Sequence, residues 1–332
     1  MPAVEPSTLV YAILDAFQDS GGSGILISSA RQHPRKFLVQ MEDRTFQVWI
    51  YAWTLTHGGR PSLPDEYRIQ MTTASSPLAL CPNGFTLLLG YEPDTGVFAG
   101  FDLSRHATFT TGSPSVQIDI NCIHSALEHG LAFDRKTNEE IAVAVRTDQM
   151  LNYMANATEL HRLGRNAALY SLLTKVSAHE SVGAAEIAPL TPERRRVLST
   201  VNRWARSASF REQVLRAYGF RCSVTRMQLR LVEAAHIFPV EAEDAPDNVR
   251  NGIALSPTYH RAFDGGLIYL DEEFVMRVNL ERELQLVTLK LDGGMEQFKS
   301  HLNRRIQLPP DKRQWPEIGL IRKANKHRHV RP

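Results

Sequence analysis

Residues 210–270, FREQVLRAYGFRCSVTRMQLRLVEAAHIFPVEAEDAPDNVRNGIALSPTYHRAFDGGLIYL, contain the pattern that decides the fold and the chemistry of this chain. His236 follows an apolar, strand-like run over 231–235. Asn251 lies in a polar loop rich in turn-forming residues, directly before a second apolar run. His260 comes a few residues later, in a segment with helical signals. Each of the three polar residues therefore has its own predicted local structure.

The segment around His260 has clear boundaries. Ser256-Pro257 is typical of a helix N-cap followed by proline at the first helical position. Gly265-Gly266 ends that helix after about two turns. The predicted order is thus strand, loop, strand, helix. Such a compact frame can bring the two histidines to one point in space.

Hydrolysis of a phosphodiester requires a base beside the attacking water and a cation on the phosphate. Histidine suits the base because its unperturbed pKa lies closest to neutrality. A second histidine with a nearby carboxylate can hold a divalent metal ion that neutralises developing charge. Asn251 can tie the loop to the base-bearing strand through its neutral amide, and it would not compete for the proton.

The segment resembles the HNH nucleases, in the branch with an LEAAHI…NGLAL…HxxFDxGL pattern. The resemblance implies a ββα-metal fold and metal-dependent cutting of DNA. It also implies that His236 is the general base, Asn251 the loop-orienting residue and His260 a metal ligand. The matching segments are Cys222-Ser-Val-Thr-Arg, Val232-Glu-Ala-Ala-His-Ile-Phe-Pro239, Asp247-Asn248, Asn251-Gly-Ile-Ala-Leu255, His260-Arg-Ala-Phe-Asp264 and Gly266-Leu-Ile268.

Two features depart from the pattern. Many HNH proteins have an acidic ligand or a histidine directly before the base, where this chain has Ala235. The metal then needs another ligand. Glu233 shares a strand face with Ala235, and Asp264 lies one helical turn after His260, so either carboxylate could serve. The second departure is the lack of paired CxxC motifs around Cys222, which predicts no structural zinc.

Composition places the chain among ordinary globular proteins. Its length of 332 residues favours more than one domain, and 43% of its residues are hydrophobic. No apolar run is long enough to span a bilayer and no signal-peptide pattern is present, so we expect no membrane partner. Three scattered cysteines favour a reducing compartment, which we expect to be bacterial cytoplasm. The net charge of +2 is unremarkable, but basic residues become more frequent in the second half.

Residues 1–155 are predicted to form a β-rich, barrel-like domain that recognises DNA or a modified base. Short β-branched and aromatic runs between 25 and 120 are separated by Gly, Pro, Asn and Asp. Aromatic side chains such as Trp49 and Trp53 can stack on a base, although most aromatics in strands belong to a core. A reading loop is predicted in the polar stretch that contains Asp102, Arg105, His106, Ser113, Ser115 and Gln117.

Residues 156–205 are predicted to be a helical linker, and residues 206–332 the nuclease domain. After residue 270 we expect strands over EEFVMRVNL and LQLVTLKL, then a helix over GMEQFKSHLNRR. The basic tail IRKANKHRHVRP is either a disordered end or a nonspecific clamp on the phosphate backbone. The arginines and aromatic residues expected to contact DNA are Arg194, Arg195, Arg203, Arg206, Arg221, Arg261, Arg105, Trp49 and Trp53.

The sequence therefore predicts a two-domain, restriction-type DNA endonuclease that uses one divalent metal ion. Mg²⁺ is the first expectation, with Mn²⁺, Ni²⁺ or Zn²⁺ as alternatives. Because one HNH unit cuts one strand, a double-strand break implies a homodimer or successive nicks. Two other functions stay open. One is a defence effector nuclease that a ligand or partner activates, and the other is a catalytically silent DNA-binding protein.

Overall fold

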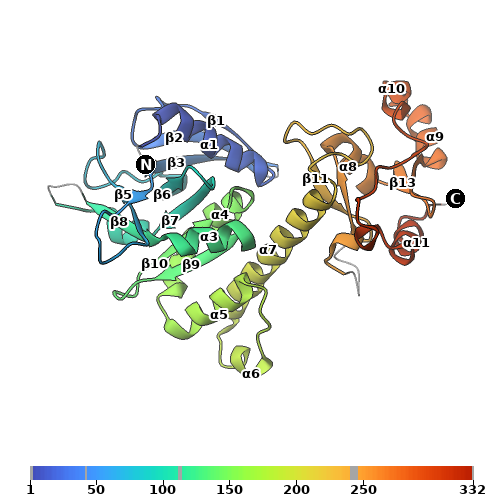
Figure 1. Ribbon diagram of the computed structural model, residues 1–332. Helices are drawn as coiled ribbons and strands as arrows, with labels where there is room; N and C mark the ends of the chain where they lie inside the picture. Colours follow the sequence, from blue (N-terminus) through green and yellow to red (C-terminus); the bar gives the residue numbers. More distant parts are fainter. Residues whose placement is uncertain (1–2, 42, 111–113, 240–245, 331–332) are drawn as a thin grey trace. The chain divides into compact units, whose positions relative to one another are not determined.

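A computed structural model describes residues 3–41, 43–110, 114–239 and 246–330. The chain divides into two compact units, Met1–Ala208 and Ser209–Pro332, which we call unit 1 and unit 2. Both units mix helices and strands, as expected for an α+β protein (Figure 1). Among the described residues, no helix combines the length and the apolar character that crossing a membrane requires.

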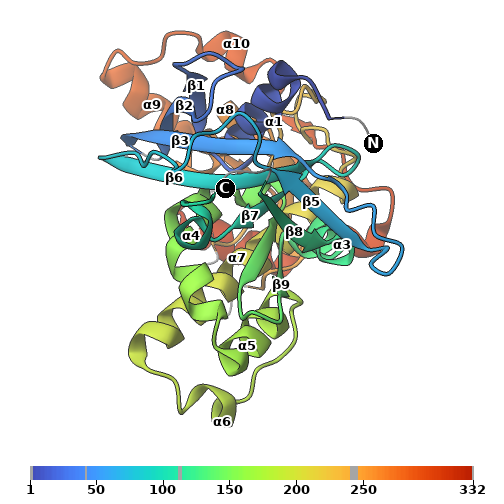
Figure 2. The ribbon, with the colours of Figure 1, turned by 90° about the vertical axis from the view of Figure 1, so that its left-hand side faces the viewer.

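Unit 1 is built on a seven-stranded sheet with the order β1-β2-β3-β6-β7-β10-β9. The central pair, β3 and β6, is parallel, and the other pairs are antiparallel. Figure 2 shows β3 and β6 side by side. The strands are β1 (Ser23–Leu26), β2 (Arg35–Met41), β3 (Arg44–Thr54), β6 (Gly84–Glu92), β7 (Val97–Phe101), β9 (Leu131–Arg135) and β10 (Ile141–Val145).

Alternating side chains of these strands fill two separate cores. Leu87 and Leu89 of β6 point to one face, and Leu88 points to the other, as the two-residue period of a strand requires. Helices α1 (Pro6–Asp19), α4 (Met150–Gly164) and α5 (Ala167–Ser177) cover the first face. The second face is covered by α3 (Ile120–His129) and by a three-stranded sheet of β4 (Thr56–His57), β5 (Glu66–Gln70) and β8 (Ser115–Asp119).

The seven-stranded sheet is open, with β1 and β9 as its described edges, so the expected barrel-like form is not found. Helices bury one apolar face of this sheet, and α3 with the small second sheet buries the other, so the sheet need not close into a barrel. Residues 156–205, for which a linker is predicted, belong to unit 1, and Leu160, Leu173 and Val201 lie in its core. The remaining helices are α2 (Leu103–His106), 3-10 helix η1 (Thr147–Gln149), α6 (Ala184–Ile187) and α7 (Pro192–Ala217).

Unit 2 contains the two predicted strands and the helix that follows them, while residues 240–245 of the predicted loop lie outside the described residues. Strand β11 (Glu233–His236) pairs antiparallel with β12 (Gly252–Leu255), and α8 (Pro257–Asp264) follows directly. Ser256 is the N-cap of α8 and Pro257 its first residue, as the sequence predicts. A glycine is needed at 252 because a Cβ there would lie 2.1 Å from Val214 Cγ2. The ββα frame expected from the HNH resemblance is therefore present.

The rest of unit 2 corrects two expectations. The segment LQLVTLKL is not a strand, because Asn279 caps α9 (Leu280–Thr288) and Leu280, Leu284 and Val287 follow helical spacing. The basic tail is not a disordered end over its described part, because its apolar residues bury one face of α11 (Ile318–His327). The other elements are η2 (Val249–Asn251), β13 (Ile268–Leu270), β14 (Val275–Val278), α10 (Met295–Lys299), β15 (Arg304–Arg305) and η3 (Lys312–Gln314).

Candidate active site and recognition surfaces

One cavity of about 560 Å³ in unit 2 is lined by both predicted histidines, His236 and His260. His236 ends strand β11, and His260 lies in the middle of α8. Asp264 also lines this cavity, whereas Glu233 is not among its lining residues. The structure thus brings together three side chains that the sequence singles out, from the two elements that the motif predicts.

His236 is held on its ring face and at its ring edge. Its ring stacks on Phe210 with the centroids 3.7 Å apart and an interplanar angle of 5°. Its Nε2 lies 3.0 Å from Asp247 Oδ1. Because a carboxylate can only accept, this contact places the ring proton on Nε2 and leaves Nδ1 as the atom able to accept a proton.

Asn251 is completely buried and joins two segments of backbone. Its Oδ1 accepts from Phe238 N at 2.8 Å, and its Nδ2 donates to Phe238 O and to Pro246 O, each at 2.9 Å. Its own carbonyl accepts from Ile237 N at 2.8 Å. These bonds fix the chain directly after His236 to the end of the loop, which is the bracing position that the resemblance implies for this residue.

Both ring nitrogens of His260 face carboxylates. Nδ1 lies 2.6 Å from Glu233 Oε2, and Nε2 lies 3.2 Å from Asp264 Oδ2. Burial lowers the pKa of His260, but the hydrogen bond with Glu233 and the negative charges of Asp264 and Glu233 outweigh it, so the net shift is upward. A cation at this ring would therefore displace a proton that the carboxylates stabilise.

The donor set at His260 fits a divalent cation in part. Within the described residues, no group of three or more His, Cys, Asp or Glu side chains is arranged to hold a metal. Two ligands at right angles on an octahedral Mg²⁺ are about 3 Å apart, because each lies about 2.1 Å from the ion. The 3.2 Å between His260 Nε2 and Asp264 Oδ2 is close to that spacing. Magnesium usually keeps several waters, so two protein ligands suffice.

Asp247 and Phe210 are functional candidates that the sequence did not assign. Asp247 belongs to the Asp-Asn segment of the quoted pattern, and that signal could have identified it. Phe210 gives no such signal, since its contact with His236 is made only in the folded chain. Arg328 and its neighbours His327 and His329 also line the cavity, although they lie far along the chain from the motif.

In unit 1, part of the predicted reading loop borders a polar cavity of about 790 Å³. His106, Ser115 and Gln117 line this cavity together with Glu66, Arg135 and Glu140. Ser113 lies outside the described residues. Three of the residues predicted for the reading loop therefore line one polar cavity. The sequence alone placed them only in the same stretch of chain.

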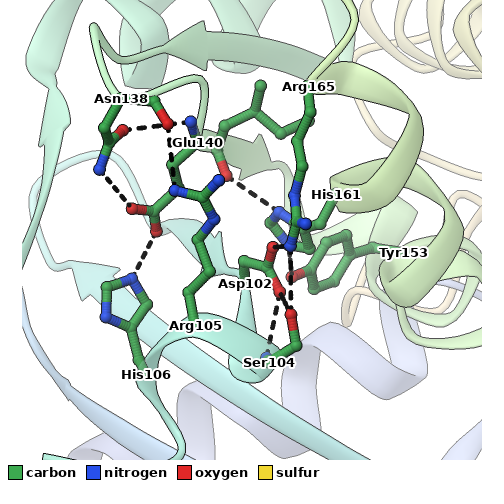
Figure 3. Close-up of polar contacts among 10 residues, drawn as sticks. Asp102, Ser104, Arg105, His106, Asn138, Glu140, Tyr153, His161 and Arg165 are labelled. Atoms are coloured by element: carbon green, nitrogen blue, oxygen red, sulfur yellow. Dashed lines mark hydrogen bonds and ion pairs between the residues drawn. The ribbon is translucent and has the colours of Figure 1, made fainter.

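Other residues of that predicted loop make hydrogen bonds and ion pairs within unit 1 (Figure 3). Asp102 is buried and accepts hydrogen bonds from Ser104 N at 3.0 Å and from Arg165 Nη2 at 2.5 Å. Burial alone would raise the pKa of Asp102, but these hydrogen bonds and nearby positive charges bring it below its usual value. Arg105 Nη1 donates to Asn138 O at 3.1 Å, and His106 Nε2 contacts Glu140 Oε1. Asp102 thus stabilises the fold of unit 1 through its bonds to Ser104 and Arg165.

The two predicted tryptophans each have a neighbour on the ring. Lys36 Nζ lies 4.4 Å from the centre of the Trp49 ring. Trp53 stacks on His33 with the centroids 4.4 Å apart, and its Nε1 donates to Thr72 O at 3.0 Å. Most of the predicted DNA-contacting arginines have exposed side chains, namely Arg105, Arg195, Arg203, Arg206, Arg221 and Arg261, while Arg194 is half-buried.

Two family models match this chain. One, described as an HNH endonuclease, matches residues 222–271, and the other, described as methylase-associated X1, matches residues 46–154. No curated protein matches. Among solved structures, the modification dependent TagI restriction endonuclease is similar at 14% identity over 83% of this chain and 80% of that one. The TM-score between the two structures is 0.28.

The matched segment 222–271 contains β11, η2 and α8, which carry His236, Asn251 and His260 respectively. The chain therefore carries an HNH endonuclease domain in its C-terminal part, preceded by a methylase-associated X1 domain. It is a nuclease, and a nuclease of this type acts on DNA. HNH nucleases generally use a divalent metal ion.

Proposed function

We propose that this protein is a metal-dependent DNA endonuclease of restriction type. Its N-terminal part selects the target, including DNA with modified bases, and its HNH domain hydrolyses the phosphodiester. The observation that carries this proposal is the single cavity lined by His236, His260 and Asp264. The X1 domain, whose description associates it with methylases, favours a target defined by base modification. Such an enzyme would act in bacterial cytoplasm, as a homodimer or by successive nicks.

In the proposed reaction, water attacks phosphorus and the bond to the leaving oxygen breaks. His236 accepts the proton of the attacking water through Nδ1, because Asp247 holds the ring proton on Nε2. Asn251 fixes the backbone after the base, so the ring keeps its position as the proton moves. Phe210 limits rotation of the ring by stacking on it.

The proposed metal ligands are His260 Nε2 and Asp264, which share the cavity. Glu233 contacts the other ring nitrogen of His260, so we assign it to orient that ring rather than to bind the ion. A bound divalent cation would neutralise the charge that develops on the phosphate and on the leaving oxygen. The cavity lining supports this order of the two carboxylates, because Asp264 borders the cavity and Glu233 does not.

A ligand-activated nuclease is the second candidate, and one feature of unit 1 favours it. The cavity of about 790 Å³ has a polar lining that includes Arg135, Glu66 and Asn138. It is large enough for a small charged ligand, because small-molecule sites occupy roughly 300–1,000 Å³. This candidate predicts that DNA is left intact until such a ligand is added.

A cleavage panel tests these proposals together. The full-length protein is incubated with unmodified DNA and with DNAs carrying different modified bases, each with Mg²⁺, Mn²⁺, Ni²⁺ or Zn²⁺. Selective cutting of a modified DNA supports the restriction enzyme. Cutting of no DNA while binding persists, with every metal and without a ligand, contradicts it and favours the activated or the silent protein.

A further inference from the structure

The cavity that holds His236 and His260 has a basic wall from outside the HNH match. Arg282 of α9 and the run His327–His329 at the end of α11 line it together with Asp264. All of these basic residues lie beyond residue 271, where the matched HNH segment ends. The cavity therefore combines the carboxylate of Asp264 near His260 with guanidinium and imidazole groups from the C-terminal part of unit 2.

The end of α11 is fixed on both sides of this run. Leu320, Ile321 and Ala324 bury one face of the helix in the core of unit 2. Asn325 Nδ2 donates to Leu270 O at 2.9 Å, and Val330 is buried after the helix ends. The run 327–329 thus leaves the helix between two anchored points, which places its backbone beside the cavity that it lines.

Arg328 is held by the elements that carry the two histidines. Its Nη1 donates to Ile237 O at 2.7 Å, and Ile237 follows His236. Its guanidinium lies 4.4 Å from the centre of the Phe263 ring, and Phe263 precedes Asp264. The side chain is only 8% exposed, although the residue lines the cavity. A guanidinium fixed in this way has little conformational freedom to lose when it binds an anion.

The second nitrogen of this guanidinium has a weaker contact. Nη2 approaches Asp264 Oδ1 only to 3.9 Å, which is beyond hydrogen-bond distance. Burial lowers the pKa of Arg328 and Asp264 opposes that shift, but arginine stays charged in proteins. A buried cation is stabilised by close pairing, and the pair with Asp264 at 3.9 Å is not close, so an anion that enters the cavity would bind favourably at Nη2. Phosphate oxygens match the guanidinium fork.

We propose that Arg328 is the phosphate-binding residue of the HNH site, contributed by the C-terminal helix. It binds a non-bridging oxygen of the scissile phosphate through Nη2, while Nη1 stays on Ile237 O. This inference rests on the proposed nuclease function and adds a residue to that site. With a divalent cation held at His260 and Asp264, the guanidinium of Arg328 would add positive charge beside the same phosphate as its negative charge increases in the transition state.

Steady-state cleavage by full-length variants tests this role. Arg328→Gln keeps an amide that can donate to Ile237 O but removes the charge, and Arg328→Lys keeps the charge. Arg313→Ala is the matched control, because Arg313 lies in unit 2 outside the basic tail and pairs with Asp311 on the surface. We expect Arg328→Gln to lower kcat about 100-fold with KM changed only a few-fold. Arg328→Lys should recover much of that loss, and Arg313→Ala should match the wild type.

Two results overturn the proposal. One is a wild-type kcat for Arg328→Gln. The other is an equal loss in Arg328→Gln and Arg328→Lys, since that shows a packing role that charge does not rescue. Thermal unfolding of each variant is measured beside its kinetics. If the wild type itself cuts no DNA in the cleavage panel, the nuclease proposal fails instead, and that outcome is visible before any variant is compared.

Discussion

His236 Nε2 lies 3.0 Å from Asp247 Oδ1, although the two residues are 11 positions apart in the chain. This contact fixes which ring nitrogen carries the proton, so it decides which nitrogen can act as a base. The loop that carries Asp247 is itself tied to the strand by Asn251. The geometry of the proposed base thus depends on three residues of the motif.

Replacing Asp247 by Asn should lower the cleavage rate about 10- to 100-fold, because an amide can donate to Nε2 and favour the wrong tautomer. DNA binding should stay within a few-fold of the wild type. The matched control is Asp311→Asn, because Asp311 pairs with Arg313 on the surface. Cleavage rates of both variants are compared at saturating metal. An unchanged rate for Asp247→Asn would remove Asp247 from the mechanism.

The two carboxylates beside His260 should differ in their effect on metal binding. We expect Asp264→Asn to raise the metal concentration for half-maximal cleavage at least about 100-fold, and Glu233→Gln only about 10-fold. The reason is that Asp264 lines the cavity, whereas Glu233 contacts Nδ1 of His260, the ring nitrogen that we do not assign to the metal. Calorimetric titration with Mn²⁺ checks the order, with Glu273→Gln as an exposed control. The reverse order would make Glu233 the ligand.

Asn251→Ala should destabilise unit 2 by about 2–4 kcal/mol, because Phe238 N, Phe238 O and Pro246 O lose a buried partner. Asn251→Asp should be equally harmful, since a carboxylate would face two carbonyl oxygens. Urea unfolding measures both, and exposed Asn202→Ala serves as the control. A fully stable Asn251→Asp protein that cuts normally would contradict the bracing role.

His33 should make the stability of unit 1 depend on pH. Burial, with a smaller contribution from the charge of Arg35, lowers the pKa of His33 to about 4. The unfolded chain, with a histidine pKa of about 6.5, binds more protons between these values. The free energy of unfolding should therefore fall as pH drops from about 6.5 towards 4, by roughly 2 kcal/mol from this group. Urea unfolding of His33→Asn at several pH values should show a shallower slope, and an identical slope would contradict the assignment.

Much of the nuclease site could be predicted from sequence because its signals are local. The apolar run before His236, the Ser-Pro cap of α8 and the glycines after it each depend on neighbouring residues. Side-chain spacing also placed Asp264 beside His260 correctly. The ranking of Asp264 over Glu233 could not be predicted, because it depends on which side chain reaches the cavity.

The parts that the sequence did not predict depend on contacts between distant segments. Arg328 reaches the cavity only because α11 packs on the core of unit 2, and a basic tail gives no sign of that packing. The strand expected over LQLVTLKL was wrong because the cap at Asn279 and helical spacing outweigh the strand preference of Val287 and Thr288. The open sheet of unit 1 depends on strand order, which propensities do not specify.

The cleavage rate of His236→Ala tests the central proposal most directly. The wild type and the variant are compared on one cleavable DNA at saturating metal, with binding to the same DNA measured in parallel. We expect the variant to lose at least about 100-fold in rate, because a positioned base contributes that much, while its DNA affinity stays within a few-fold. A variant that still cuts at the wild-type rate would contradict the assignment of His236 as the base.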